Sequence, residues 1–250
     1  MKKQTINKYL RRFGVELHGL GYLEKIKKNS FRNNAFDNQL RFIKPGEGLT
    51  IFDVGANNGS VTEKYARLYP GAQIHSFEPI PELITLFEQR NGHNNRIALN
   101  KLALSNVNGE QTLHLNKSLD TSSLLVSSNI GGSSDALCQT VSTISIQTIT
   151  LDQYCADRNI NQIDILKMDT QGSELNILKG AERMLRENRI KLIFSEVYFK
   201  PQYEQQPLFD ELVAYLRPFN IELQDIYETI YNDKQLLWGD AIFVHHSLLA

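Results

Sequence analysis

Cysteine is scarce in this chain, and long apolar runs are missing. Two cysteines, Cys138 and Cys155, stand seventeen positions apart among 250 residues and form no C-x-x-C pair. We therefore expect neither a structural zinc site nor a disulfide framework, and a reducing compartment, the cytoplasm, fits this usage best. No apolar stretch approaches the roughly 20 residues that span a bilayer, and no apolar segment of a secretory signal follows the charged start MKKQTINKYLRRFG.

A large excess of charge of one sign is also missing, since the net charge is −1. With 41% hydrophobic and 22% charged residues, the composition excludes a disordered chain, a collagen and a coiled-coil rod. A chain of this length can bury one sizeable core without metal or disulfides. The charge is uneven, however. Residues 1–32 hold nine Lys or Arg against two acids, hence +7, which leaves 18 against 26, hence −8, for the rest.

Residues 1–45 are predicted to form a basic helical arm ahead of the body at 46–250. The turn-rich sequence K-P-G-E-G at 44–48 marks the boundary. Several explanations of the arm's charge stay open: a solvated helix face, docking of the arm on its own acidic body, contact with another subunit, or contact with an anionic membrane surface. Its apolar residues recur at helical spacing, and they are Ile6, Tyr9, Leu10, Phe13 and Leu17.

The body alternates between apolar runs and helical patterns. Such alternation with short connections predicts an α/β fold with a mainly parallel sheet. Residues 117–135 are predicted to be an irregular loop, of a length that often forms a lid. A helix that Ser173 caps is expected to carry a core stripe through Leu185. The expected strands are 50–54, 73–77, 96–104, 111–115, 139–149, 163–167, 190–194, 221–226 and 241–244, and the other expected helices are 61–68, 81–88, 151–158 and 208–216.

The most informative segment is I-F-D-V-G-A-N-N-G at 51–59, a buried strand running into a turn and a helix. Gly55 and Gly59 would let the backbone pass close to a ligand at the carboxyl end of the strand. The spacing is G-x-x-x-G rather than G-x-G-x-x-G, and the turn has no basic residue. Both facts argue against a nicotinamide dinucleotide and against a P-loop. A cofactor with a nucleoside but no phosphates fits better.

Glu78 supports a nucleoside site, because it ends the second expected strand, twenty-three positions after Gly55. An acid at that place can accept hydrogen bonds from both hydroxyls of a ribose. The alternative is a surface acid before the turn at Pro79. Asp53 leaves two interpretations open as well, since it can either contact the ligand or brace the glycine turn by accepting hydrogen bonds from backbone N–H groups.

From these motifs the sequence resembles the FkbM family of S-adenosyl-L-methionine-dependent methyltransferases over roughly residues 49–246. The resemblance rests on FDVGANNG at 52–59, FEP at 77–79, ALSNVNGE at 103–110, ILKMDTQGSELNILKGA at 165–181 and WGDAIFV at 238–244. It implies a Rossmann-like class I methyltransferase fold, with a seven-stranded sheet that is mainly parallel and has one antiparallel strand. It also implies S-adenosyl-L-methionine as the cofactor and O-methylation of a hydroxyl on a sugar, a glycan or a secondary metabolite. The arm lies outside it.

The cofactor site expected from this reasoning lies around the glycine turn. Its residues are Asp53, Gly55, Asn57, Gly59, Glu78 and Ala103. Asn57 and Ser60 are candidates for the methionine part of the cofactor. Leu102, Ala103 and Leu104 can form an apolar slot for adenine, although core packing explains them equally well.

Asp169 is the first candidate for a general base, because it ends the fourth expected strand beside the crevice. Lys167 shares its face and can lower the acid's pKa, hold the substrate, or form a structural ion pair. Glu196, which ends the fifth expected strand, is the second candidate base. A helix-capping role is the alternative for Asp169. For Glu174 we favour a structural role as an acid at a helix N-terminus.

A metal is not expected, because Asp169 and Glu196 have no third ligand of comparable support. His75 is interpreted as a core residue, His245 and His246 as solvated, and His114 as the histidine worth testing. Four aromatic residues can either stack on a sugar or stabilise the edge of the core, and they are Tyr198, Phe199, Tyr203 and Trp238.

The leading hypothesis is an S-adenosyl-L-methionine-dependent O-methyltransferase whose partner is a small-molecule or glycan hydroxyl substrate. The alternative from another class is a non-catalytic S-adenosyl-L-methionine-binding scaffold or regulator. A dehydrogenase is disfavoured by the turn spacing. A nucleic-acid partner is not expected, because the body is acidic and aromatic and basic residues do not alternate near the site.

Overall fold

The computed structural model describes residues 34–128 and 135–249. The helical stripe predicted at 6–17 therefore lies outside the described residues, as does part of the loop predicted at 117–135. The compact unit that contains the sheet starts at Ala35 and includes helix α3 (Ala35–Phe42), which precedes the boundary predicted at residue 45.

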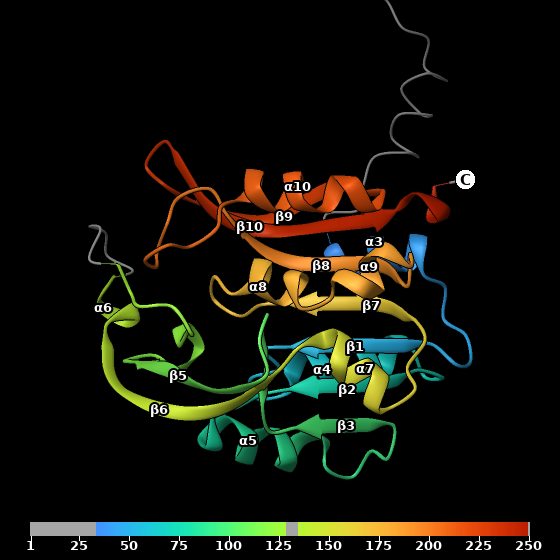
Figure 1. The fold of residues 1–250 in the computed structure, drawn as a ribbon, viewed down its shortest axis with the longest axis horizontal. Helices are drawn as coiled ribbons and strands as arrows, with labels where there is room; N and C mark the ends of the chain where they lie inside the picture. Colours follow the sequence, from blue (N-terminus) through green and yellow to red (C-terminus); the bar gives the residue numbers. More distant parts are fainter. Residues whose placement is uncertain (1–33, 129–134, 250) are drawn as a thin grey trace, which may run out of the picture. The chain divides into compact units, whose positions relative to one another are not determined.

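Seven strands form the main sheet in the order β3-β2-β1-β7-β8-β10-β9, stacked in that order in Figure 1. β10 runs antiparallel to both of its neighbours, and the other pairs are parallel. The prediction of a mainly parallel seven-stranded sheet with one antiparallel strand is confirmed. The strands are β1 (Thr50–Val54), β2 (Gln73–Phe77), β3 (Ile97–Asn100), β7 (Ile163–Met168), β8 (Ile190–Tyr198), β9 (Ile221–Asn232) and β10 (Gln235–His245).

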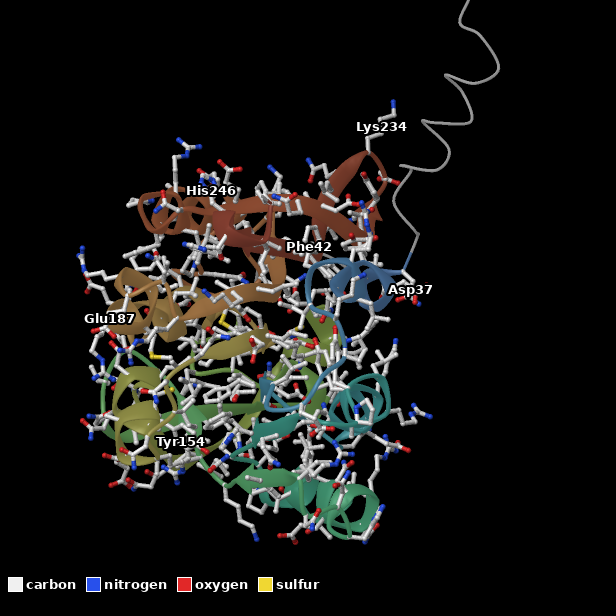
Figure 2. All side chains as sticks on the ribbon, turned by 90° about the vertical axis from the view of Figure 1, so that its right-hand side faces the viewer. Asp37, Phe42, Tyr154, Glu187, Lys234 and His246 are labelled. Atoms are coloured by element: carbon white, nitrogen blue, oxygen red, sulfur yellow. The ribbon has the colours of Figure 1, made fainter. Side chains whose placement is uncertain are left out.

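Helices cover both faces of this sheet, which is why its central strands are apolar on both sides. Adjacent residues of β1 show the two layers: Phe52 packs in the core beneath α7 and Ile51 in the core beneath α3 and α4. Tyr154 of α7 meets Phe52 edge to face, and Figure 2 labels it on that helix. The helices are α7 (Leu151–Asp157), α8 (Glu174–Lys179), α9 (Glu182–Arg186) and α10 (Phe209–Leu216) on one face, α4 (Ser60–Leu68) with α3 on the other, and α5 (Pro81–Asn91) by β3.

A second, three-stranded sheet of order β4-β6-β5 stands beside the first (Figure 1). It consists of β4 (Ala103–Leu104), β5 (Gly109–Asn116) and β6 (Thr140–Ile149). The single strand predicted at 96–104 is therefore wrong. The chain leaves the main sheet after Asn100, and Ala103 pairs with Thr148 of β6 instead.

The helix predicted to start at Ser173 is two helices, α8 and α9, which meet at Gly180. A Cβ on Gly180 would lie 2.1 Å from the backbone oxygen of Ser105, so the helix pair packs directly on the loop that follows β4. Ser173 occupies the N-cap position of α8, but its Oγ makes no capping hydrogen bond and is buried without a partner among the described residues. The carboxylate of Glu174 holds the turn before the helix, since it accepts the backbone N–H of Thr170 at 2.8 Å.

Short elements complete the described chain. They are α6 (Asp135–Cys138) and the 3₁₀ turns η2 (Leu119–Thr121), η3 (Arg217–Phe219) and η4 (His246–Leu248). At the tip of the β9–β10 hairpin, Lys234 extends away from the sheet (Figure 2). In the described ranges no helix is long and apolar enough to cross a membrane.

Candidate active site

The glycine turn after β1 is shaped by protein neighbours. Gly55 has φ +71°, and a Cβ there would lie 1.9 Å from the backbone oxygen of Asp169. Gly59 has φ +79°, and its Cβ would lie 2.2 Å from Nδ2 of Asn91, which donates to the Gly59 carbonyl. Neither glycine can carry a side chain, because the strand-end backbone and α5 occupy that space. Gly55 lines both clefts described below, whereas Gly59 lines neither.

Lys167 holds the turn from below. Its Nζ lies 3.0 Å from Oδ1 of Asp53, donates to the carbonyl of Gly55 at 2.8 Å, and lies 3.9 Å from Oδ2 of Asp169. Burial opposes its charge, but the Asp53 and Asp169 carboxylates raise the pKa of Lys167 above its ordinary value. Its closest ion pair is with Asp53, a partner that the sequence did not suggest, and the predicted ion pair with Asp169 is present at the longer distance.

Asp53 lies fully buried beneath the turn. It accepts a hydrogen bond from Oγ1 of Thr62 at 2.6 Å and lines neither of the two clefts described below. Of the two roles left open for Asp53, bracing the turn is the one that fits this position. It does so through Lys167 rather than through backbone N–H groups.

Glu78 borders a cleft of about 670 Å³, the Glu78 cleft. Its Oε2 accepts the backbone N–H of Asn57 and its Oε1 that of Ile80, both at 2.9 Å. Burial raises its pKa to about 7, against the effect of these two bonds. A carboxylate offers about four lone-pair directions, so Glu78 can still accept bonds from a ligand. Ala103 and Leu104 contribute to the apolar wall opposite.

Residues 117–128 close over this cleft rather than lying free. Asp120 of η2 accepts a hydrogen bond from Nδ2 of Asn57 at 2.7 Å. Ser123 donates through Oγ to the carbonyl of Gln171 at 2.7 Å, and Tyr203 places its hydroxyl 2.7 Å from the carbonyl oxygen of Thr121. These three bonds attach the described part of the predicted lid to the site, and further backbone bonds join it to His114 and to Gln202.

A second cleft of about 1130 Å³, the Glu196 cleft, adjoins the first. Asp169 and Gln171 line both clefts, so they form the shared wall. The Asp169 side chain is 47% exposed, which leaves its carboxylate accessible. The walls of the Glu196 cleft also include Asn57, Ser60, Lys167, Glu196, Tyr198 and Trp238.

Gln171 is a site residue that sequence reasoning missed. Its Nε2 donates to Oδ1 of Asp169 at 3.1 Å and to Oε2 of Glu196 at 2.8 Å, and its Oε1 lies 3.0 Å from the hydroxyl of Tyr203. Its backbone is left-handed, with φ +56°. In the K-x-D-x-x-G-x-E pattern Gln171 is an unspecified position, and Glu196 lies 25 residues further along. Only its place between Asp169 and Gly172 could have signalled a role.

Glu196 is half-buried and surrounded by acids. Burial first, then the negative charges of Asp169 and Glu174, raise its pKa well above the ordinary range. Tyr198 donates its hydroxyl to Oε2 of Glu196. Asp240 stands opposite Glu196 in the β8–β10 pair, and burial raises its pKa to about 7. Asp240 lies within the quoted W-G-D-A-I-F-V motif, yet the sequence did not single it out.

The four histidines considered in the sequence lie in different surroundings. His75 is a core residue, as predicted, since Nδ1 lies 2.8 Å from the hydroxyl of Tyr154 and burial lowers its pKa to about 4. The prediction for His245 is wrong: the side chain is buried and Nε2 lies 3.1 Å from Oδ1 of Asn188. His246 is exposed, beside Glu222. His114 lines neither cleft.

The aromatic candidates also separate. Phe199 stacks against Phe209 at 5.0 Å and belongs to the edge of the core. Tyr198 and Tyr203 are buried with their hydroxyls directed at site residues. Trp238 lines the Glu196 cleft. Across residues 34–128 and 135–249, no three His, Cys, Asp or Glu side chains are grouped as metal ligands.

Comparisons with known proteins agree with this geometry. Residues 53–223 match the family described as the methyltransferase FkbM domain. The 2-O-methyltransferase NoeI of Sinorhizobium fredii is 28% identical over 180 residues, which cover 70% of this chain and 73% of that protein.

Solved structures with a similar arrangement are methyltransferases of low identity. A Streptococcus thermophilus rRNA methylase has a TM-score of 0.49 at 12% identity, covering 86% of this chain and 98% of that one. Magnesium protoporphyrin IX methyltransferase of Synechocystis PCC 6803 has a TM-score of 0.45 at 11% identity, covering 97% and 96%.

Proposed function

The chain belongs to the FkbM methyltransferase family, and from that premise we propose that it transfers the methyl group of S-adenosyl-L-methionine to a hydroxyl of a sugar, a glycan or a secondary metabolite. The observation that carries the proposal is the position of Glu78. The residue is 4% exposed and borders a cleft with an apolar wall, and its carboxylate retains lone pairs beyond its two backbone bonds.

The residues of the Glu78 cleft fit a nucleoside with a polar tail. Glu78 would accept the ribose hydroxyls, and Ala103 with Leu104 would pack on adenine. Ser173 Oγ is buried at the wall of this cleft without a partner among the described residues, and a polar ligand atom would satisfy it. Asn57 and Ser60 stand toward the Glu196 cleft, where the methionine part would extend.

When bound, S-adenosyl-L-methionine supplies a methyl group on a sulfonium. Transfer is an in-line displacement, so the protein's main task is to align the acceptor hydroxyl and exclude water. Asp169 stands on the wall that both clefts share and would take the hydroxyl proton as general base. Lys167, whose Nζ is 3.9 Å away, keeps the Asp169 carboxylate oriented. Glu196 would bind the acceptor in the second cleft.

Calorimetry on the full chain tests the cofactor site. S-adenosyl-L-methionine and S-adenosylhomocysteine should bind in the micromolar range, and Glu78→Ala should weaken both by about 10- to 100-fold, since bonds to a charged group are worth roughly 1.5–3 kcal/mol. The matched control is Glu82→Ala, an exposed acid on α5. Folded wild-type chain that binds neither compound would refute the proposal.

A methyl-transfer assay separates an enzyme from a scaffold. The full chain is incubated with radiolabelled S-adenosyl-L-methionine and a panel of monosaccharides, glycosides and hydroxylated small molecules. Transfer that disappears in Asp169→Asn supports catalysis with Asp169 as the base. Tight cofactor binding with no transfer to any compound would favour the non-catalytic alternative.

A further inference from the structure

Gln171 is the group that joins the two acidic candidates of the site. The side-chain amide carries two hydrogens, and Nε2 lies 3.1 Å from Oδ1 of Asp169 and 2.8 Å from Oε2 of Glu196. Each hydrogen therefore has one carboxylate to bond. Tyr198 donates to Glu196 and Lys167 lies near Asp169, but Gln171 donates to both acids and so reduces the repulsion between them.

The orientation of the amide is determined by its surroundings. Turning the amide over would direct Oε1 at two carboxylates, which cannot donate a hydrogen bond when ionised. In the observed orientation Oε1 lies 3.0 Å from the hydroxyl of Tyr203, a side chain only 1% exposed. The backbone of Gln171 is held as well, because its carbonyl accepts the Ser123 hydroxyl at 2.7 Å.

We propose that Gln171 is a positioning residue of the methyl-transfer site: it fixes the carboxylates of Asp169 and Glu196 relative to each other, so that Asp169 faces the acceptor hydroxyl. This inference rests on the proposed function. Tyr203 supports Gln171 from behind, and through Ser123 and Thr121 the same network reaches the segment that closes over the Glu78 cleft.

Replacement of Gln171 should change the pH at which Glu196 takes up a proton, and this can be measured before any methyl acceptor is known. Glu196 loses its amide donor when Gln171 is replaced, while the neighbouring negative charges stay, so it should take up a proton at higher pH. The ionisable groups that face this corner are Tyr198 of β8, Lys167 and Asp169 at the end of β7, Glu174 of α8, Asp240 of β10 and Tyr203.

Carboxyl NMR on the full chain measures this directly. Glutamate is labelled with ¹³C at the carboxyl carbon, and the Glu196 signal is assigned by its loss in Glu196→Gln. In Gln171→Met, which keeps the length of the side chain and removes its donor, the titration midpoint of Glu196 should rise by about one pH unit. Tyr203→Phe should raise it less. Gln202→Met is the control, because Gln202 lines the same cleft without a bond to either carboxylate.

S-adenosylhomocysteine calorimetry on the same variants separates the two proposals. Gln171→Met should bind this compound within about threefold of wild type, because Glu78 is untouched. If wild type binds no S-adenosylhomocysteine, the proposed function fails whatever the NMR result. If wild type binds it and the Glu196 midpoint in Gln171→Met equals that of wild type, the positioning role is overturned. Should Gln171→Met not fold, an unchanged midpoint in Tyr203→Phe overturns it equally.

Steady-state kinetics give a second measurement, with any compound of the panel that accepts a methyl group. The acid limb of the kcat profile of Gln171→Met should move to higher pH, and kcat at pH 7 should fall at least tenfold with KM for S-adenosyl-L-methionine changed less than threefold. A purely structural role would lower kcat at every pH without moving the limb, and that result contradicts the proposal.

Discussion

Glu78 accepts hydrogen bonds from two backbone N–H groups, and the residue is almost completely buried. Burial raises its pKa to about 7, so near neutral pH the carboxyl is only partly ionised. The ionised form is the one that accepts hydrogen bonds from two hydroxyls. We therefore expect ligand binding in the Glu78 cleft to depend on pH near neutrality.

We expect the affinity for S-adenosylhomocysteine to increase with pH. With a pKa of about 7, the ionised fraction of Glu78 rises about tenfold between pH 6 and pH 8, and the association constant should rise by a similar factor. Calorimetry at pH 6, 7 and 8 measures it. Glu78→Gln should bind weakly with little pH dependence; an equally steep rise in that variant would assign the effect to another group.

A second prediction at the residue scale concerns the buried ion pair of Lys167 with Asp53. In Lys167→Met the Asp53 carboxylate stays fully buried without its cation, which should lower the free energy of unfolding by about 3–5 kcal/mol. Urea denaturation measures it. Lys101→Met, whose ion pair with Glu88 is exposed, should change stability by less than about 1 kcal/mol. Equal losses in the two variants would contradict the structural role given to Lys167.

Among the elements, the break between α8 and α9 lets the helix pair pack on the loop after β4, and Glu174 begins α8. Gly180 makes the close approach to Ser105 possible. The left-handed Gln171–Gly172 turn before α8 depends on the Glu174 carboxylate, which accepts N–H bonds from both Thr170 and Gly172.

Gly180→Ala should therefore be costly, because its Cβ would lie 2.1 Å from backbone that cannot move away alone. We expect a loss of about 1–3 kcal/mol in the free energy of unfolding, measured by urea denaturation. The control is Gly46→Ala, whose Cβ would meet only the Lys44 carbonyl oxygen at 4.0 Å and which should stay within about 0.5 kcal/mol. An unchanged free energy of unfolding in Gly180→Ala would mean that the α8–α9 pair can move away from the Ser105 loop without cost.

For the whole molecule, three strands bring buried carboxyls to one end of the sheet: Glu78 after β2, Glu196 in β8 and Asp240 in β10. Each has a folded-state pKa above its ordinary value, so the folded chain binds more protons than the unfolded one between the two values. Stability from these groups is full at low pH and declines as the pH rises. His75, with its pKa lowered to about 4, acts in the opposite direction between about 4 and 6.5.

Asp240→Asn isolates one of these contributions. The pKa of Asp240 rises from 3.8 to about 7, so its carboxyl penalises the folded state increasingly through that window. The variant should melt several degrees higher than wild type at pH 8, and the difference should shrink toward pH 4. Thermal melts across that range measure it. A constant difference at every pH would exclude titration of Asp240 as the cause.

Local pattern was sufficient for much of the fold and for the turn that defines the site. The apolar runs at 50–54, 73–77 and 163–168 are strands because both faces are covered, and the glycine turn with Glu78 follows from them. The apolar run of a strand and the small residues of a turn are local patterns of the sequence, so these features can be predicted before the distant contacts that hold them are known.

Only the tertiary structure decided which side chains meet. The Asp53–Lys167 pair, the Gln171 bridge to Glu196, the transfer of Ala103 to a second sheet and the burial of His245 each join residues far apart in the chain. Hydrogen bonds and ion pairs act over about 3 Å, and strand order determines which distant residues come that close. A single sequence carries no local record of that order, so it can name the candidates but cannot pair them.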